Sequence, residues 1–186
     1  MNLDKQIRQS VHALQQGGVI AYPTESVFGL GCDPDTPDAV QRILALKQRP
    51  IEKGLILIAA SFDQVKKYLQ PVSPDIQQRV FATWPGPHTW LWPVNDDVPE
   101  LLRGHYSTLA IRVSAHPVVQ QICNSLGKAI VSTSANPAGK PPACNADEIR
   151  QYFDERLDFI IDTGTGECGS PTEIRDAMSN RIIRPA

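Results

Sequence analysis

Long apolar segments are missing from this sequence. The longest uninterrupted apolar run spans residues 55–60, far short of the roughly 18 residues that a membrane-spanning helix needs. Residues 1–16 carry charged and amide side chains in place of the apolar core of a secretion signal. We therefore expect a cytoplasmic protein with no membrane segment.

Cysteine is scarce and dispersed. The four cysteines form no C-x-x-C pair, so the sequence indicates neither a zinc site nor a dense disulfide framework, and this usage fits a reducing cytoplasm. The four histidines lack metal-ligand spacing, and the glycine-rich Walker and Rossmann patterns are absent. We expect no protein-ligated metal and no tightly bound cofactor.

An excess of charge of either sign is also missing. The chain has 18 Lys plus Arg against 20 Asp plus Glu, which argues against a protein whose whole surface binds nucleic acid. The charge is uneven, however, because residues 41–54 contain four cations and one anion. Such a local cationic patch suits a small anionic ligand better than a long polyanion.

What the sequence does have is the composition of a globular domain. Hydrophobic residues make up 41% and charged residues 20% of the 186 residues, which excludes a wholly disordered chain. A chain of this length usually folds as one unit. We therefore expect a single domain over residues 1–186.

Apolar periodicity predicts helices that are interleaved with short buried strands. Helices are expected at residues 3–14, 37–48, 61–69, 74–80, 117–126 and 145–153. Strands are expected at residues 19–22, 55–59, 89–94, 108–113, 129–132, 159–161 and 182–183. The pairs Ser61 with Gln64 and Asn145 with Glu148 resemble capping boxes at two helix starts. Some strands follow each other through links too short for a crossover, so we predict an α/β fold with a mixed parallel and antiparallel sheet.

Four polar segments lie next to predicted strand ends, where open α/β sheets usually bind ligands. They are residues 22–31 (YPTESVFGLG), 47–50 (KQRP), 84–89 (WPGPHT) and 132–136 (STSAN). In the second segment, the heads of Lys47 and Arg49 can converge from a helix end and a loop onto one phosphate chain or carboxylate. The small polar side chains of the fourth segment offer several donors in a small volume, as a phosphoryl group or an oxyanion requires.

Each segment taken alone has a purely structural alternative. Glycine and proline are common in ordinary turns, and cations late in a helix offset its dipole. Cys32 has no marked His or Asn partner, so a buried thiol is a better interpretation than a nucleophile. Trp90 and Trp92 alternate in a predicted strand, and we interpret them as a core and a face residue rather than as platforms for bases.

These four segments in this order, with AIRVSAHP at residues 110–117 before the last, closely resemble the motifs of the YrdC/Sua5 family over residues 14–184. The resemblance implies a YrdC/RibB-like fold, in which a twisted mixed sheet with flanking helices curves around a concave, positively charged cavity. It also implies that L-threonine, bicarbonate or CO2, and ATP react to give L-threonylcarbamoyladenylate and diphosphate. That reaction is the first step of N6-threonylcarbamoylation (t6A) of adenosine 37 in tRNAs that read codons beginning with A.

The same resemblance implies roles for individual residues. The K-x-R and S-x-N motifs of the family, which are expected to be catalytic, fall on Lys47, Arg49, Ser134 and Asn136. The expected threonine contacts are Thr24, Ser132 and Thr172, with Ser170 as an alternative to Thr172. The expected ATP contacts are the four catalytic residues together with Lys53, Thr89, Arg112 and Arg184.

The expected ligands and partners also follow from the resemblance. ATP is expected as a substrate, with Mg2+ held by its phosphates, beside L-threonine and bicarbonate. The proteins of the t6A transferase complex are expected partners, and direct contact with tRNA stays open. An alternative function is an RNA-binding or ribosome-maturation factor whose cationic cavity contacts backbone phosphates, and its support is the basic patch alone.

Overall fold

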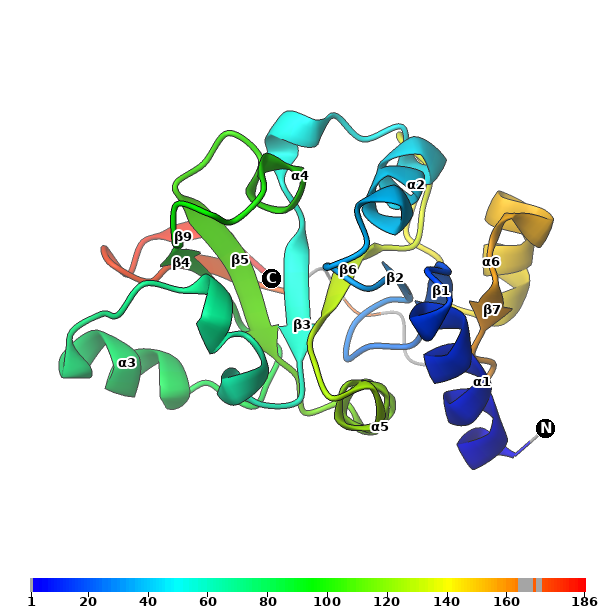
Figure 1. Cartoon of the computed structure of the whole chain (residues 1–186), viewed down its shortest axis with the longest axis horizontal. Helices are drawn as coiled ribbons and strands as arrows, with labels where there is room; N and C mark the ends of the chain where they lie inside the picture. Colours follow the sequence, from blue (N-terminus) through cyan, green and yellow to red (C-terminus); the bar gives the residue numbers. More distant parts are fainter. Residues whose placement is uncertain (1, 164–168, 170–171) are drawn as a thin grey trace.

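The computed structural model describes residues 2–163, 169 and 172–186. Its described strands form one nine-stranded sheet in the order β7-β1-β2-β6-β3-β5-β4-β8-β9 (Figure 1). The strands are β1 (Ile20–Tyr22), β2 (Gly29–Gly31), β3 (Ile56–Ala59), β4 (Thr89–Pro93), β5 (Thr108–Val113), β6 (Ile130–Ser134), β7 (Phe159–Ile160), β8 (Ile174–Asp176) and β9 (Ile182–Arg184). Three neighbouring pairs are parallel, namely β1 with β7, β3 with β5, and β4 with β8, and the others are antiparallel. The predicted α/β fold with a mixed sheet is confirmed.

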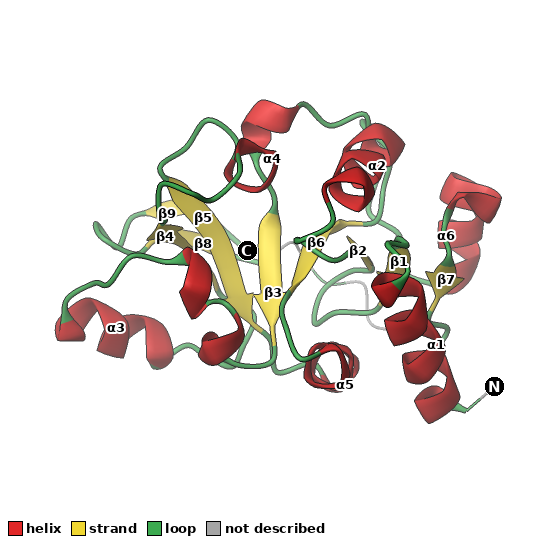
Figure 2. Cartoon of the chain, in the orientation of Figure 1, coloured by secondary structure: helices red, strands yellow, loops and turns green. Residues whose placement is uncertain are grey.

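Helices flank the strands on both sides (Figure 2). They are α1 (Leu3–Gln15), α2 (Pro37–Lys47), α3 (Pro74–Phe81), α4 (Glu100–Arg103), α5 (Pro117–Leu126) and α6 (Ala146–Phe153), with the 3-10 turns η1 (Ile51–Lys53), η2 (Phe62–Gln64), η3 (Lys66–Tyr68) and η4 (Asp154–Arg156). In α1, Ile7, Val11 and Leu14 recur at helical spacing and are buried. No helix in the described part of the chain has the length and apolar character needed to cross a bilayer.

Side-chain alternation along the strands separates the two faces of the sheet. On β3, Leu57 lies in the larger of the two apolar cores, whereas Ile58 packs in the smaller core with residues of α1 and α5. Ile56 is two residues before Ile58 and so points to the same face, but it lines an open cavity together with its cross-strand partner Ser132. One face of the sheet is therefore covered by helices over β1 and hollow over β5.

The helix predicted at residues 61–69 is wrong, because this segment forms the two short turns η2 and η3. The Ser61 side chain makes no capping hydrogen bond. Gln64 instead accepts from the Ala60 amide at 2.9 Å and donates to the Cys123 carbonyl at 3.0 Å, so it links the end of β3 to α5. The second predicted cap is present, since Asn145 accepts from the Glu148 amide at 2.9 Å.

Two strands were not predicted, because neither has the apolar pattern of a strand. β2 is Gly-Leu-Gly. A Cβ on Gly31 would lie 2.7 Å from Cε1 of Tyr22, so Gly31 allows close packing between strands rather than a turn. β8 contains Arg175 and Asp176 and lies near the sheet edge.

The interpretation of Trp90 and Trp92 also needs correction. Trp90 and Trp92 are two residues apart in β4, so both point to the same face, and both are buried in the larger core. Cys32 and Cys123 are buried free thiols, as the interpretation of Cys32 expected. Cys144 is disulfide-bonded, which the cysteine spacing did not predict.

One wall of the cavity depends on two glycines that have positive φ. Gly54 ends η1 with φ 59°, and Gly104 ends α4 with φ 67°. A Cβ on Gly104 would overlap the carbonyl oxygen of Glu52 and would lie 2.6 Å from the amide nitrogen of Gly54. Only glycine allows the two backbones to approach this closely.

Replacement of Gly104 tests that constraint. Gly104→Ala is expected to lower the free energy of unfolding by about 3 kcal/mol, because steric overlap adds to backbone strain. Gly127→Ala is the matched control, since Gly127 ends α5 with φ 78° and no heavy atom lies within 4 Å of an added Cβ, so strain of about 1 kcal/mol is expected. Urea denaturation measures both losses, and equal losses would contradict the account.

Candidate active site

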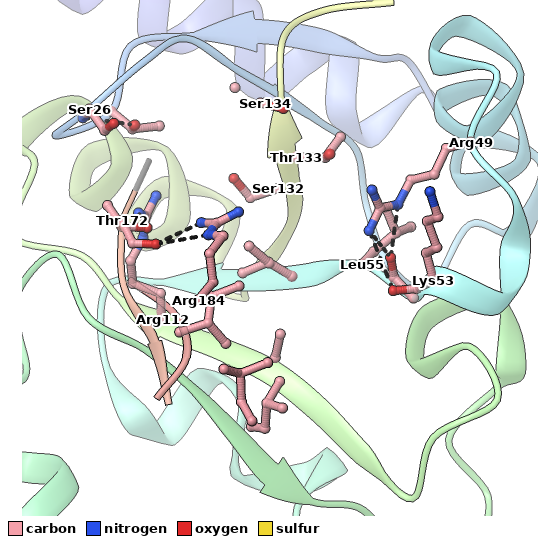
Figure 3. Close-up of a pocket in the computed structure, with 18 of the residues that line it drawn as sticks. Ser26, Arg49, Lys53, Leu55, Arg112, Ser132, Thr133, Ser134, Thr172 and Arg184 are labelled. Carbon is pink, nitrogen blue, oxygen red and sulfur yellow. Dashed lines mark hydrogen bonds between the residues drawn. The ribbon is translucent and has the colours of Figure 1, made fainter. Parts of the chain in front are cut away.

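The open part of the sheet face is a cavity of about 370 Å³. Side chains of β3, β5 and β6 form its floor, and η1, β8 and β9 contribute to its walls. Figure 3 shows Arg49 and Lys53 at one side of the cavity and Arg112 and Arg184 at the other, with Ser132 between them. Elements that are far apart in the sequence therefore meet around one concave space.

The cavity is strongly cationic. Five cations line it, namely Arg49, Lys53, Arg103, Arg112 and Arg184, and no carboxylate is among its described lining residues. Burial and the nearby charges of Arg112 and Arg49 lower the pKa of Arg184, and burial lowers the pKa of Arg49. Guanidinium groups stay charged despite such shifts, so the cavity attracts anions.

Two of these arginines are held by main-chain carbonyl groups. Arg49 donates from Nε and Nη2 to the carbonyl oxygen of Gly54, at 3.0 and 2.9 Å. Arg103 donates to the carbonyl oxygens of Val98 and Tyr106, at 2.9 and 2.8 Å. Neutral acceptors fix the direction of each guanidinium but do not cancel its charge.

Thr172 links the two arginines at the other side of the cavity (Figure 3). Its hydroxyl oxygen accepts from Nη1 of Arg112 at 3.1 Å, and its carbonyl oxygen accepts from Nε and Nη2 of Arg184 at 3.2 and 2.7 Å. Because the hydroxyl oxygen is an acceptor here, its own hydrogen is free to donate to a ligand. Ser170, the alternative to Thr172, lies outside the described residues.

Several further hydroxyl-bearing residues line the cavity, and three of the expected site residues, Thr24, Ser132 and Ser134, are among them. The Ser132 oxygen accepts from the phenol of Tyr22 at 2.8 Å. Burial raises the pKa of Tyr22, so the phenol stays a donor and the Ser132 hydrogen is left for a ligand. The hydroxyl of Ser134 donates to Oδ1 of Asn136 at 2.7 Å. The Ser134 oxygen therefore keeps its lone pairs to accept from a ligand.

Lys47 lies behind the cavity wall and is only 6% exposed. Its ammonium group donates to the carbonyl oxygen of Ser134 and to the carbonyl and Oδ1 oxygens of Asn136, the last two at 2.9 and 3.1 Å. Burial, and then the charge of Arg49, lower the pKa of Lys47 to about 8. The charged groups of Lys47 and Arg49 were expected to converge on one anion. Arg49 lines the cavity but Lys47 does not, and Lys47 instead holds the segment 134–136 through its hydrogen bonds.

Two other predicted contacts do not line the cavity. Asn136 accepts from the ammonium group of Lys47 and is not among the lining residues. Thr89 is fully buried, with a hydroxyl that has no hydrogen-bond partner among the described residues. β4 lies between β5 and β8, and this position encloses Thr89. Conversely, Arg103 and Tyr106 line the cavity but were not predicted, because no recognisable motif surrounds them. Within the described ranges, no cluster of His, Cys, Asp and Glu could hold a metal ion.

Residues 12–186 match the family model of Sua5, YciO and YrdC, which bears the description telomere recombination. The chain belongs to the Sua5/YciO/YrdC family. The resemblance drawn from the five motifs is thereby confirmed. The threonylcarbamoyl-AMP synthase of Photobacterium profundum is 53% identical over 180 residues, which cover 96% of this chain and 97% of that relative. The synthase of the same name from Nitrosococcus oceani is 51% identical over 178 residues and covers 96% of each chain.

Solved structures of the Sua5/YciO/YrdC family have the same fold. A double variant of P. abyssi Sua5 superimposes with a TM-score of 0.92 at 30% identity, covering 100% of this chain and 57% of that longer one. P. abyssi Sua5 in complex with L-threonine gives a TM-score of 0.85 at 31% identity, over 91% and 50% of the two chains. E. coli YciO gives 0.83 at 26% identity, over 97% and 89%.

The lowered pKa of Lys47 predicts a titration that can be observed. As the pH rises through about 8, the ammonium group is expected to lose its proton. Because Arg49 contributes to this shift, Arg49→Gln is expected to raise the pKa of Lys47. Lys53→Gln, which removes another cavity cation, is the matched control and is expected to leave it unchanged. NMR titration of the Lys47 side chain measures the midpoints, and a value near 10.5 in the wild type would contradict the structure.

Proposed function

We propose that this chain is a threonylcarbamoyl-AMP synthase, which converts L-threonine, bicarbonate or CO2, and ATP into L-threonylcarbamoyladenylate and diphosphate. One observation supports this most directly. A single cavity combines five cations, no described carboxylate and several hydroxyl groups, as a triphosphate and a polar amino acid together require. The names of the relatives, and the L-threonine bound to P. abyssi Sua5, point to the same activity.

The chemistry requires positioning rather than a protein nucleophile. The neutral amine of threonine attacks CO2 and loses a proton to solvent, which gives a carbamate. An oxygen of this carbamate attacks the α-phosphorus while the bond to diphosphate breaks and diphosphate leaves. The protein must hold two anions against their mutual repulsion and stabilise charge on the phosphates. Cys32 does not compete as a nucleophile, because burial raises the pKa of its thiol.

The residues divide between the two substrates. We assign Arg49, Lys53 and Arg184 to the phosphates, and the hydroxyls of Ser132 and Thr172 to threonine. Thr24 and Arg112 lie near the latter group, while Lys47 and Asn136 shape the loop that presents Ser134. Mg2+ enters with ATP on the phosphate oxygens, since the described lining side chains include no carboxylate.

The product is a mixed anhydride, so it must be used soon after release. We place the reaction at the start of t6A formation on tRNA, with a transferase complex as the partner that consumes the product. An RNA-binding function is less well supported, because the cations line a cavity of about 370 Å³, and a nucleic-acid backbone needs an exposed groove.

A diphosphate-release assay tests the proposal. With ATP and bicarbonate present, L-threonine is expected to stimulate release at least about tenfold over serine or no amino acid, because a site built to bind the substrate discriminates by the contacts it completes. Salt-sensitive binding of tRNA without threonine-dependent release of diphosphate would overturn the assignment and favour the RNA-binding alternative.

Removal of one cavity cation is the second test. Arg49→Ala is expected to lower kcat/KM by about 100-fold, because a charge that faces the phosphates is lost, while the fold survives. Arg150→Ala is the matched control, since Arg150 is exposed and pairs with Asp147 and Asp162 away from the cavity. Thermal denaturation checks that both variants fold, and full activity in a folded Arg49→Ala variant refutes the assigned role.

A further inference from the structure

Arg112 is the most enclosed of the arginines in the cavity, at 5% exposure. Its Nη1 donates to Thr172, but its buried Nε has no hydrogen-bond partner among the described residues. An enclosed guanidinium with an unused donor needs something that fixes its orientation, because an unpaired buried charge is costly.

The carboxylate of Glu25 faces this guanidinium. Oε2 of Glu25 lies 3.7 Å from Nη2 of Arg112, which is beyond hydrogen-bonding distance, and this oxygen also lacks a hydrogen-bond partner in the described structure. The two groups therefore interact through charge, and Nη2 of Arg112 has no hydrogen-bond partner among the described residues.

Glu25 is itself fixed through its other oxygen. Oε1 accepts from the hydroxyl of Ser114 and from the amide of Ala115, the latter at 3.0 Å. Burial opposes ionisation of Glu25, but Arg112 and the hydrogen bond from Ser114 more than offset it and lower the pKa of this carboxyl. The carboxylate is thus charged and is anchored beside Arg112 by two hydrogen bonds.

The sequence positions explain why this contact matters. Glu25 stands between Thr24 and Ser26, which both line the cavity, whereas its own side chain does not. Ser114 and Ala115 follow directly after β5, which carries Arg112. One carboxylate therefore links the loop after β1 to the strand that presents the arginine.

We propose that Glu25 is a positioning residue that orients Arg112 towards a substrate anion, either the carboxylate of the amino acid or a phosphate of the nucleotide, without touching it. This inference rests on the proposed function for its kinetic test. If Glu25 acted only through its negative charge, removal of that charge would strengthen anion binding in the cavity, whereas loss of a positioning residue weakens it.

Glu25→Gln is the decisive variant. Glutamine preserves the shape and the acceptor for Ser114 and Ala115, but it turns a donor towards Arg112. We expect kcat/KM for diphosphate release to fall about 10- to 100-fold, through a raised KM for either L-threonine or ATP. Arg112→Gln is expected to raise the KM of the same substrate. The substrate whose KM rises in both variants carries the anion that Arg112 binds.

A double-mutant cycle separates positioning from general damage. If Glu25 acts through Arg112, Glu25→Gln is expected to change kcat/KM less than about twofold in the Arg112→Gln background. Asp158→Asn is the matched control, because Asp158 also accepts from a main-chain amide (Val19, 2.7 Å) and pairs with an arginine (Arg42, 2.6 Å) outside the cavity. Independent losses that multiply, or a lowered KM in Glu25→Gln, would overturn the proposal.

The kinetics of Ser114→Ala and an NMR order parameter of Arg112 test the proposal if Glu25→Gln does not fold or the wild type is inactive. Should Glu25→Gln fail to fold, Ser114→Ala removes one anchor of the carboxylate and is expected to raise the same KM by a smaller factor, whereas an unchanged KM contradicts the proposal. Should the wild type release no threonine-dependent diphosphate, the proposed function fails by itself. The NMR order parameter of the Arg112 Nε–H bond then remains as the test, and it is expected to fall in Glu25→Gln but not in Asp158→Asn.

Discussion

The structure depends on holding several like charges together around one cavity without neutralising them. Arg49, Arg103 and Arg184 each donate to main-chain carbonyl oxygens rather than to carboxylates. Lys47, behind the wall, is held mainly in the same way. Carbonyl dipoles satisfy the donors and fix their directions, while the positive charge stays available to attract an anionic ligand. Arg112 differs from these three arginines, because it donates to the hydroxyl of Thr172 and has a carboxylate nearby, that of Glu25 at 3.7 Å.

The arrangement of the sheet makes this site possible. Side-chain alternation places Ile56, Ser132 and Arg112 on the face that α1 and α5 cover only at its other end. The far wall is built from β8, β9 and the residues just before β8, which lie close to the C-terminus and add Thr172 and Arg184 from outside the central strands. The cavity thus combines residues from Thr24 to Arg184, and its cations meet only in the folded sheet.

The sequence predicted the parts of this structure that rest on apolar periodicity or on contiguous motifs. β3 is an apolar run and β5 is largely apolar, and the motif hydroxyls of Ser132 and Ser134 do line the cavity. β2 and β8 were missed because glycine and charged residues conceal their strand character. Arg103 and Glu25 could not be assigned roles, since their contacts arise from tertiary packing around Gly104 and Ser114. For the same reason a spacing argument could not show that Lys47 and Thr89 are enclosed.

The most direct test of the central claim is to locate the ligands by NMR. Titration with a non-hydrolysable ATP analogue and L-threonine, followed in amide and arginine side-chain spectra, is expected to shift signals of Arg49, Arg184, Ser132 and Ser134 together. Signals of the outer helices α1 and α6 are expected to stay in place. Shifts confined to those helices, or none around the cavity at saturating ligand, would contradict the claim that uncancelled cations in this cavity bind the substrates.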